Sequence, residues 1–182
     1  MTSNVSTAAW RDPGLLEVGR GTVGREGIDY NGHFNVAHYR LAFDHASDVL
    51  FAHLGLGAED YNPRANATLM VVEDHTRYHA ELRLGESYRI LAQLVGHGPK
   101  TIHYLLFMEN LDRGGLAATH EELALHVDLA TRRASPLPAE VLPTLEALED
   151  AHARLPRHPD LGRAVGQPPP TRSGAAPRAG AG

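Results

Sequence analysis

The sequence has no cysteine, no long apolar run, and no basic start followed by an apolar stretch. The absence of cysteine excludes disulfide bonds, zinc sites built on thiolates, and a cysteine nucleophile. No window approaches 18 consecutive apolar residues, so no transmembrane helix is expected. The first residues, MTSNVSTAAWRDPG, lack the pattern of a secretory signal. We therefore expect a cytoplasmic protein that has no membrane partner.

The chain also lacks a large excess of either positive or negative charge. The formal net charge is -5 and the pI is about 6.2, which gives no general attraction to nucleic acid or to anionic membranes. Hydrophobic residues make up 42% and charged residues 21% of the 182 residues, which is typical of a soluble globular protein. The glycines of residues 15–27 do not form a dinucleotide-binding fingerprint, because a polar loop follows them. We expect one domain with a full core and no cofactor.

A long amphipathic helix is predicted over residues 35–54. Its apolar side chains recur at three- and four-residue steps, the period of one helix face: Tyr39, Phe43, Ala46, Val49, Leu50 and Leu54. Asn35 is a typical N-cap, and Gly55 or Gly57 can end the helix. The first backbone N–H groups of such a helix lack partners within it and carry a partial positive charge. They could therefore stabilise a developing oxyanion.

Four polar residues at two-residue spacing lead into this helix: Asp29, Asn31, His33 and Asn35, with Gly32 among them. Each has an ordinary structural explanation when taken singly, because Asn31-Gly32 is a common turn and Asn35 is a cap. A single histidine such as His33 is typical of a protein surface. Together, ahead of a helix apolar enough to be the centre of a core, they favour a functional loop.

The second half of the chain has the alternating pattern and turn residues of hairpin-linked strands. Strands are predicted at residues 68–82, 86–96, 101–111 and 116–129, with a weaker one at 15–27 and a second helix at 139–155. In the last strand, we expect Leu123, Leu125, Val127 and Leu129 to face the core and His120, Glu122, His126 and Asp128 to face away. One helix followed by such strands predicts an α+β fold, an antiparallel sheet packed against the helix.

Composition divides the chain into three parts. Residues 1–14 are expected to be a flexible N-terminal arm, and residues 15–155 the folded domain. Half of the twelve prolines lie in the last 27 residues, among glycine, alanine and arginine. Because such a composition buries too little apolar surface to offset the cost of ordering, residues 156–182 are predicted to be a disordered tail.

Twelve histidines raise the question of a metal site. The best candidates are His75 with His79, and His120 with the two glutamates that follow it. Neither spacing matches the HExxH motif of zinc helices, and in a strand second neighbours share a face, whereas fourth neighbours do so in a helix. We therefore expect no metal. The histidines are interpreted as replacing lysines on a polar sheet face, since Lys100 is the only lysine.

The segment IDYNGHFNVAHY, residues 28–39, resembles the active-site loop and central helix of hotdog-fold thioesterases. These include the 4-hydroxybenzoyl-CoA thioesterase type and the plant acyl-ACP thioesterases, whose loop reads D-x-N-x-H-x-N. The similarity is greatest to thioesterases associated with carnitine dehydrogenase, which are taken to hydrolyse betainyl-CoA. It extends to VEDH at residues 72–75, KTIH at 100–103 and ATHEELALHVD at 118–128, and so covers residues 15–138. The chain departs from this group at FNVA, residues 34–37, which leaves the shape of the acyl pocket open.

The resemblance implies a hotdog fold, an antiparallel sheet of five or six strands curled around the central helix. It also implies a homodimer or homotetramer, with the acyl-CoA substrate in a groove between two subunits. A single curled sheet has exposed edges that pairing would protect, so the physics agrees.

For catalysis, the resemblance points to the loop. Asp29 is the first candidate for the carboxylate that activates water or attacks the carbonyl carbon, with Asn31 and His33 orienting it or the substrate. Backbone N–H groups from Gly32 to Asn35 would bind the oxyanion. Glu73 is the rival carboxylate.

The alternative for Glu73 is a structural one, as the partner of Arg77 on the same strand face. Tyr30, Phe34, Tyr39 and Tyr78 could form an aromatic wall that holds a trimethylammonium group by cation–π attraction, worth about 0.5–2 kcal/mol. Ordinary core packing is the alternative for these rings, especially for Tyr39.

The function predicted is hydrolysis of an acyl-CoA with a short polar acyl group, betainyl-CoA being one candidate. Two alternatives stay open: a hotdog enoyl-CoA hydratase or dehydratase, and a non-catalytic acyl-CoA-binding protein. No serine lies in a nucleophile-elbow sequence, which disfavours an α/β-hydrolase mechanism.

Overall fold

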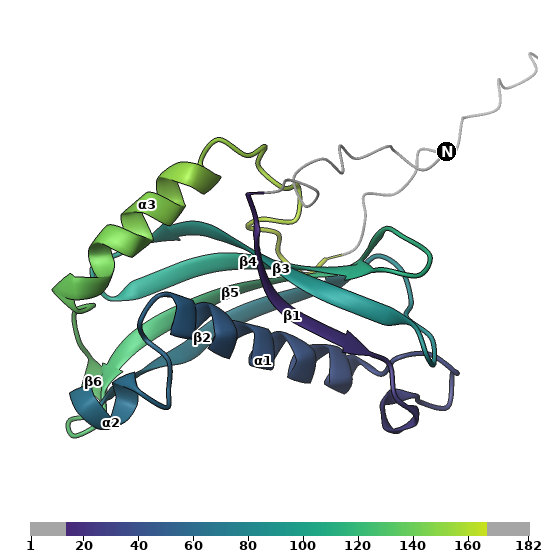
Figure 1. The fold of residues 1–182 in the computed structure, drawn as a ribbon, viewed down its shortest axis with the longest axis horizontal. Helices are drawn as coiled ribbons and strands as arrows, with labels where there is room; N and C mark the ends of the chain where they lie inside the picture. Colours follow the sequence, from purple (N-terminus) through teal and green to yellow (C-terminus); the bar gives the residue numbers. More distant parts are fainter. Residues whose placement is uncertain (1–13, 167–182) are drawn as a thin grey trace, which may run out of the picture.

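The computed structural model describes residues 14–166, which form one curled sheet crossed by a long helix (Figure 1). The strands are β1 (Leu16–Thr22), β2 (Ala67–Tyr78), β3 (Ser87–His97), β4 (Thr101–Asn110), β5 (Leu116–Asp128) and β6 (Arg133–Ala134). They are ordered β1-β3-β4-β5-β2, with β6 beside β5. Every pairing is antiparallel. The predicted α+β fold, with an antiparallel sheet curled around a central helix, is confirmed.

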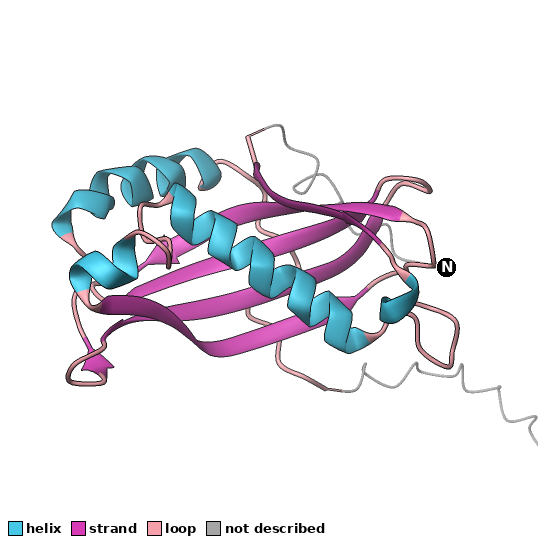
Figure 2. Ribbon diagram, turned by 60° about the horizontal axis from the view of Figure 1, so that its bottom comes forward, coloured by secondary structure: helices cyan, strands magenta, loops and turns pink. Residues whose placement is uncertain are grey.

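Helix α1 (Val36–His53) lies diagonally across one face of the sheet, and the shorter helices α2 (Tyr61–Ala65) and α3 (Leu142–His152) lie near one end of it (Figure 2). The predicted apolar face of α1 is buried at Tyr39, Phe43, Ala46 and Leu50. Val49 is an exception, because its side chain is 50% exposed. Between Ala46 and Leu50 the sheet is contacted by Ser47, whose hydroxyl donates to a buried carboxylate.

The predicted orientation of β5 is wrong. Its helix-facing side carries His120, Glu122, Ala124 and His126, all buried, whereas Leu123 and Leu125 are only partly buried on the outer side. The reason is that the buried polar groups have partners. The side chain of Glu122, for example, accepts hydrogen bonds from α1 and from β4. Alternation of hydrophobicity alone cannot reveal such pairing.

A bulge in β2 sets which side chains face α1. The register shifts between Val71 and Glu73, so that Asp74 lies opposite Glu122 and Glu73 opposite Leu123. Side chains beyond the bulge therefore alternate cleanly. Those of Asp74, Thr76 and Tyr78 lie on the α1 side, and those of Glu73, His75 and Arg77 on the outer side.

The outer side of the sheet has a second, smaller apolar cluster, made of Leu15, Leu91, Leu105, Phe107 and Leu161. Leu161 belongs to a segment, residues 155–166, that we call the strap. The prediction of disorder from residue 156 onward is wrong for the strap, because His158, Asp160 and Leu161 are buried. The remainder of the predicted tail, residues 167–182, and most of the predicted arm lie outside the described residues.

Within residues 14–166, no helix has both the length and the apolar character needed to cross a membrane.

Candidate active site

The loop that precedes α1 is closed by its own backbone. The Gly32 N–H donates to the carbonyl oxygen of Asp29 at 3.0 Å, and the Asp29 N–H donates to that of His33 at 3.1 Å. Gly32 has a φ of +81°, a left-handed conformation that side chains rarely adopt. The tight turn presents the side chain of Asp29 to the backbone, where Oδ1 accepts from the Asn31 N–H at 2.8 Å.

Asn35 joins the acid to the helix. Its Oδ1 accepts from the Ala37 N–H at 2.9 Å, which confirms the predicted N-cap, and its Nδ2 donates to Asp29 Oδ2 at 3.2 Å. Asp29 is thus fixed at the positive end of α1 by both of its oxygens. Burial opposes ionisation of this carboxyl, but the hydrogen bonds from Asn31 and Asn35 outweigh it, and the pKa of Asp29 lies below its ordinary value.

The histidine of the loop is near the acid without being bonded to it. His33 Nδ1 lies 4.0 Å from Asp29 Oδ1 and 3.3 Å from the carbonyl oxygen of Phe34. The predicted cluster of Asp29, Asn31, His33 and Asn35 is therefore brought together around one turn.

Not all of the backbone amides predicted to bind the oxyanion are free to do so. Three of the four amides from Gly32 to Asn35 already donate to backbone oxygens, those of Gly32, Phe34 and Asn35. Among residues 14–166, the amides of His33 and Val36 are the two near the helix start without an acceptor. Val36 was not predicted, because its side chain carries no chemistry.

A cleft of about 350 Å³ lies beside the helix start. It lies between the loop and the end of β2, and its walls are His33, Phe34, Val36, Tyr39, Tyr78, His79, Ala80 and Glu81. Asp29 and Asn35 are not among the residues that line the cleft. The cleft therefore contains both residues with unengaged amides, and Asp29 is held at the same helix start by its hydrogen bond from Asn35.

Three aromatic rings form a continuous corner of the cleft. The Phe34 and Tyr39 ring centroids are 4.8 Å apart, and those of Tyr39 and Tyr78 are 5.2 Å apart. Phe34 and Tyr39 are buried, whereas Tyr78 is 49% exposed and offers its ring to a ligand. Tyr30 is 96% exposed and does not line the cleft, so the expected aromatic wall lacks this fourth ring.

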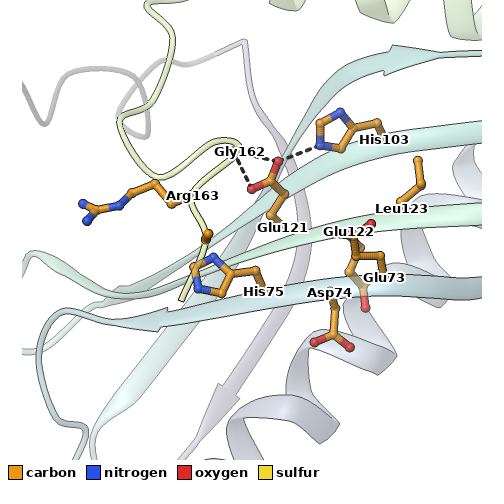
Figure 3. Close-up of a pocket in the computed structure, with 10 residues that line it drawn as sticks. Glu73, Asp74, His75, His103, Glu121, Glu122, Leu123, Gly162 and Arg163 are labelled. Carbon is orange, nitrogen blue, oxygen red and sulfur yellow. Dashed lines mark hydrogen bonds and ion pairs between the residues drawn. The ribbon is translucent and has the colours of Figure 1, made fainter. Parts of the chain in front are cut away.

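Glu73 lies elsewhere. It lines a second pocket, of about 340 Å³, together with His75, His103, Glu121 and residues 162–164 of the strap (Figure 3). There Glu121 accepts from the Gly162 N–H and contacts His103 Nε2 at 2.8 Å. The structure does not bring Glu73 to the loop. Its expected partner, Arg77, is bound instead to Asp160 of the strap.

A buried ionic network lies farther along α1. Arg40 Nη1 contacts Glu122 Oε1 at 2.7 Å and His120 Nε2 at 3.0 Å, and its Nη2 lies 3.3 Å from Asp74 Oδ2. Burial by itself disfavours the Glu122 carboxylate, yet hydrogen bonds from His120, Tyr104 and Ser47 lower its pKa to about 2. Sequence patterns do not reveal this network, because its members lie on four different elements, α1, β2, β4 and β5.

This network includes His120 and Glu122, which were considered above as candidate metal ligands. Ligand atoms of Asp74, His120 and Glu122 lie within 4.8 Å of one another, a spacing that could hold an ion. The guanidinium of Arg40 already contacts all three and supplies the positive charge that a metal would bring. His75 and His79 lie apart, in the second pocket and in the cleft respectively.

The fold and sequence match proteins of related chemistry. The chain is 37% identical over 146 residues to a betainyl-CoA thioesterase from Pseudomonas aeruginosa, covering 79% of this chain and 90% of that protein. It is 33% identical to an L-carnitine dehydrogenase/betainyl-CoA thioesterase from Rhizobium meliloti, where the match covers 77% of this chain and 28% of that larger protein.

Among solved structures, a hypothetical protein from Staphylococcus aureus in complex with CoA superposes with a TM-score of 0.76 at 26% identity. The match covers 85% of this chain and 97% of that one. A protein from Pseudomonas putida KT2440, described as a candidate thioesterase, gives a TM-score of 0.74 at 28% identity, with coverage of 85% and 98%. The family model of the thioesterase-like superfamily matches residues 23–145, which include the loop, α1 and the sheet from β2 to β5. The chain therefore belongs to the thioesterase-like superfamily.

Proposed function

We propose that this protein is an acyl-CoA thioesterase that hydrolyses betainyl-CoA, and that the cleft at the start of α1 is its active site. One observation carries the proposal: an ionised carboxylate and two unengaged amides meet at a helix start beside a cleft. Its support from relatives is that a protein 37% identical over most of its length is a betainyl-CoA thioesterase.

The cleft would hold the thioester carbonyl with its oxygen toward the amides of His33 and Val36. As water adds to the carbonyl carbon, charge moves onto this oxygen, and both donors strengthen their hydrogen bonds to it. A single preorganised donor of this kind is typically worth about 2.7–4 kcal/mol of barrier. The positive end of α1 adds to the effect.

Asp29 would orient and polarise the attacking water. Because the Asn31 N–H and the Asn35 amide keep this carboxylate ionised, it presents a negative charge to the water at any pH near neutral. His33, whose Nδ1 lies 4.0 Å from Asp29 Oδ1, would order the water or the substrate from the same loop. We assign this role to Asp29 in preference to Glu73, because Glu73 lines the second pocket.

The acyl group would lie against Tyr78. A trimethylammonium group packs favourably on an accessible aromatic face, by about 0.5–2 kcal/mol depending on its desolvation. Tyr78 is the exposed ring of the corner, and the carboxylate of Glu81 lines the same cleft. Both features favour a cationic acyl group over a neutral one.

A thiol-release assay with a panel of acyl-CoAs tests the function. Betainyl-CoA should release free CoA at a higher kcat/KM than 3,3-dimethylbutanoyl-CoA, its neutral isostere with carbon in place of nitrogen. Substituting Tyr78→Leu should reduce this preference, whereas Tyr78→Phe should preserve it. Hydration of crotonyl-CoA without CoA release would indicate a hydratase instead, and saturable binding without turnover would indicate a binding protein. Either result would refute the proposal.

The proposal includes a homo-oligomer, dimer or tetramer, in the cytoplasm. Strand β2 is an edge of the sheet with 12 residues, and Val72 and Tyr78 on it are about half exposed. An open edge of this length is normally covered or paired. Light scattering coupled to size-exclusion chromatography should give at least twice the mass of one chain, which is 19.7 kDa.

A further inference from the structure

Tyr78, the ring that the cleft offers to a ligand, lies at the end of an edge strand. Within residues 14–166, β2 is paired on one side only, with β5, and Tyr78 is its last residue. The regular pairing ends directly after it, because the N–H groups of His79 and Ala80 both donate to the carbonyl oxygen of Ala117. Strand ends held in this way open readily, so the sheet alone fixes the position of this ring weakly.

The two residues that flank Tyr78 have their side chains on the opposite side of the sheet. Successive side chains of a strand alternate between its faces, so Tyr78 lies on the α1 side, whereas Arg77 and His79 lie on the outer side. There both bind Asp160 of the strap. Arg77 Nη1 donates to Oδ1 of this residue, and His79 Nε2 lies 2.8 Å from its Oδ2. One carboxylate therefore holds the chain immediately before and immediately after Tyr78.

Asp160 is buried and ionised. It is 3% exposed, and its Oδ2 also accepts from the Thr119 hydroxyl at 2.7 Å. Burial opposes ionisation of Asp160, but the hydrogen bonds from His79 and Thr119 and the charge of Arg77 outweigh it and lower its pKa. The carboxylate therefore binds all three groups as an anion.

The strap is also anchored by the residues that follow Asp160. Leu161 packs in the outer apolar cluster, and the Gly162 N–H donates to both carboxylate oxygens of Glu121, at 3.0 and 2.8 Å (Figure 3). These contacts do not involve Asp160. Loss of its carboxylate should therefore loosen the end of β2 without detaching the strap.

We infer that Asp160 is a positioning residue for Tyr78 and thereby supports the preference for a cationic acyl group. The inference rests on the proposed function, in which the ring of Tyr78 packs against the trimethylammonium group. This attraction requires the cation over the face of the ring, within about 6 Å of its centroid. A shift at the end of β2 would move the ring away from that geometry.

Substituting Asp160→Asn keeps the size of the side chain and removes its charge. The carboxylate accepts from Arg77 at Oδ1 and from His79 and Thr119 at Oδ2. An amide has only one acceptor oxygen, so in either orientation its NH2 group faces a donor. The chain on both sides of Tyr78 should then be held less firmly.

The first test is the ratio of kcat/KM for betainyl-CoA to that for 3,3-dimethylbutanoyl-CoA. The cation–π contact with Tyr78 should contribute about 2- to 30-fold to this ratio. On a logarithmic scale, Asp160→Asn should lose at least half of what Tyr78→Leu loses. In the Tyr78→Leu background it should leave the ratio unchanged, because the ring that it positions is absent. A general loss of stability lowers both kcat/KM values together and does not change the ratio.

The second test needs no turnover. In protein labelled with 13C-tyrosine, the ring signals of Tyr78, assigned with Tyr78→Phe, should shift or broaden in Asp160→Asn. Tyr61, which lies on α2 and contacts His126, is the internal reference, and its signals should not move. Glu121→Gln is the matched control, because it alters a contact of the strap away from Asp160. It should change neither the Tyr78 signals nor the substrate ratio.

Unchanged Tyr78 signals in Asp160→Asn would overturn the inference, and so would an unchanged ratio or an equal fall in the ratio with and without the Tyr78 ring. If Asp160→Asn does not fold, Arg77→Gln removes the same contact from the strand and should give the same two results. If the unmodified chain releases no CoA, or does not prefer betainyl-CoA, the proposed function fails. The Tyr78 signals then still decide whether Asp160 positions the ring.

Discussion

The substitution Glu122→Gln tests the buried network of Arg40, Glu122 and Tyr104 directly. The amide has the size and shape of a protonated glutamate, so the variant keeps the packing and removes only the charge. The pKa of Glu122 is lowered from 4.5 to about 2 by its hydrogen bonds, which exceed the opposing effect of burial. At 1.36 kcal/mol per pKa unit, this corresponds to about 3 kcal/mol favouring the ionised form in the folded state.

The sign of the pH dependence follows from the lowered pKa. The stabilisation is fully present above the unfolded pKa of 4.5 and is lost as the pH falls toward about 2. Glu122→Gln should therefore destabilise the protein by about 3 kcal/mol at pH 7, and by roughly half of that at pH 3. The urea midpoint at pH 7 should fall by about 1–3 M, given the usual dependence of unfolding free energy on urea.

Urea unfolding of both proteins at pH 7 and pH 3 measures the two differences. Glu121→Gln, one residue earlier on the outer side of the same strand, is the control and should cost less than about 1 kcal/mol. A Glu122→Gln penalty below 1 kcal/mol at pH 7, or one equal at both pH values, would refute the reasoning.

Three substitutions probe the loop and the helix start. Asn35→Ala removes the cap and should cost about 0.5–2 kcal/mol in urea unfolding, while NMR titration should show the pKa of Asp29 rising toward its ordinary value as it loses a hydrogen bond. Gly27→Ala would place a Cβ 2.6 Å from the Phe34 ring, so it should displace this cleft residue and raise KM for acyl-CoA. Gly32→Ala meets no atom within 4 Å and should cost only the left-handed strain, about 1–2 kcal/mol, as a lower Tm. Equal KM values for the two glycine variants would contradict this distinction.

Local patterns predicted the helices and strands well, because each of them depends on residues within a short stretch of the sequence. The cap at Asn35, the buried face of α1 at Phe43 and Leu50, and the hairpin-linked strands all follow from spacing and turn residues. The loop cluster around Asp29 was predicted from the same stretch, and the structure brings it together. These features depend on neighbours along the chain.

The failures depend on partners far away in sequence. The orientation of β5 was inverted because Glu122 is buried against Arg40, 82 residues earlier. The strap was predicted to be disordered because its composition is rich in proline, yet Asp160 meets Arg77 from a strand 83 residues earlier. The spacing of apolar residues along the chain does not reveal a charged side chain that is buried because it forms an ion pair.

Turnover of the Asp29→Asn variant tests the central claim most directly, because the amide preserves the shape of the loop and removes its acid. The account predicts that kcat/KM for betainyl-CoA falls by about 100-fold or more, with the fold intact by circular dichroism. Glu73→Gln, measured beside it, should remain within twofold of the unmodified enzyme, because Glu73 lines the other pocket. Near-normal turnover by Asp29→Asn together with a large loss in Glu73→Gln would contradict the assignment of the active site.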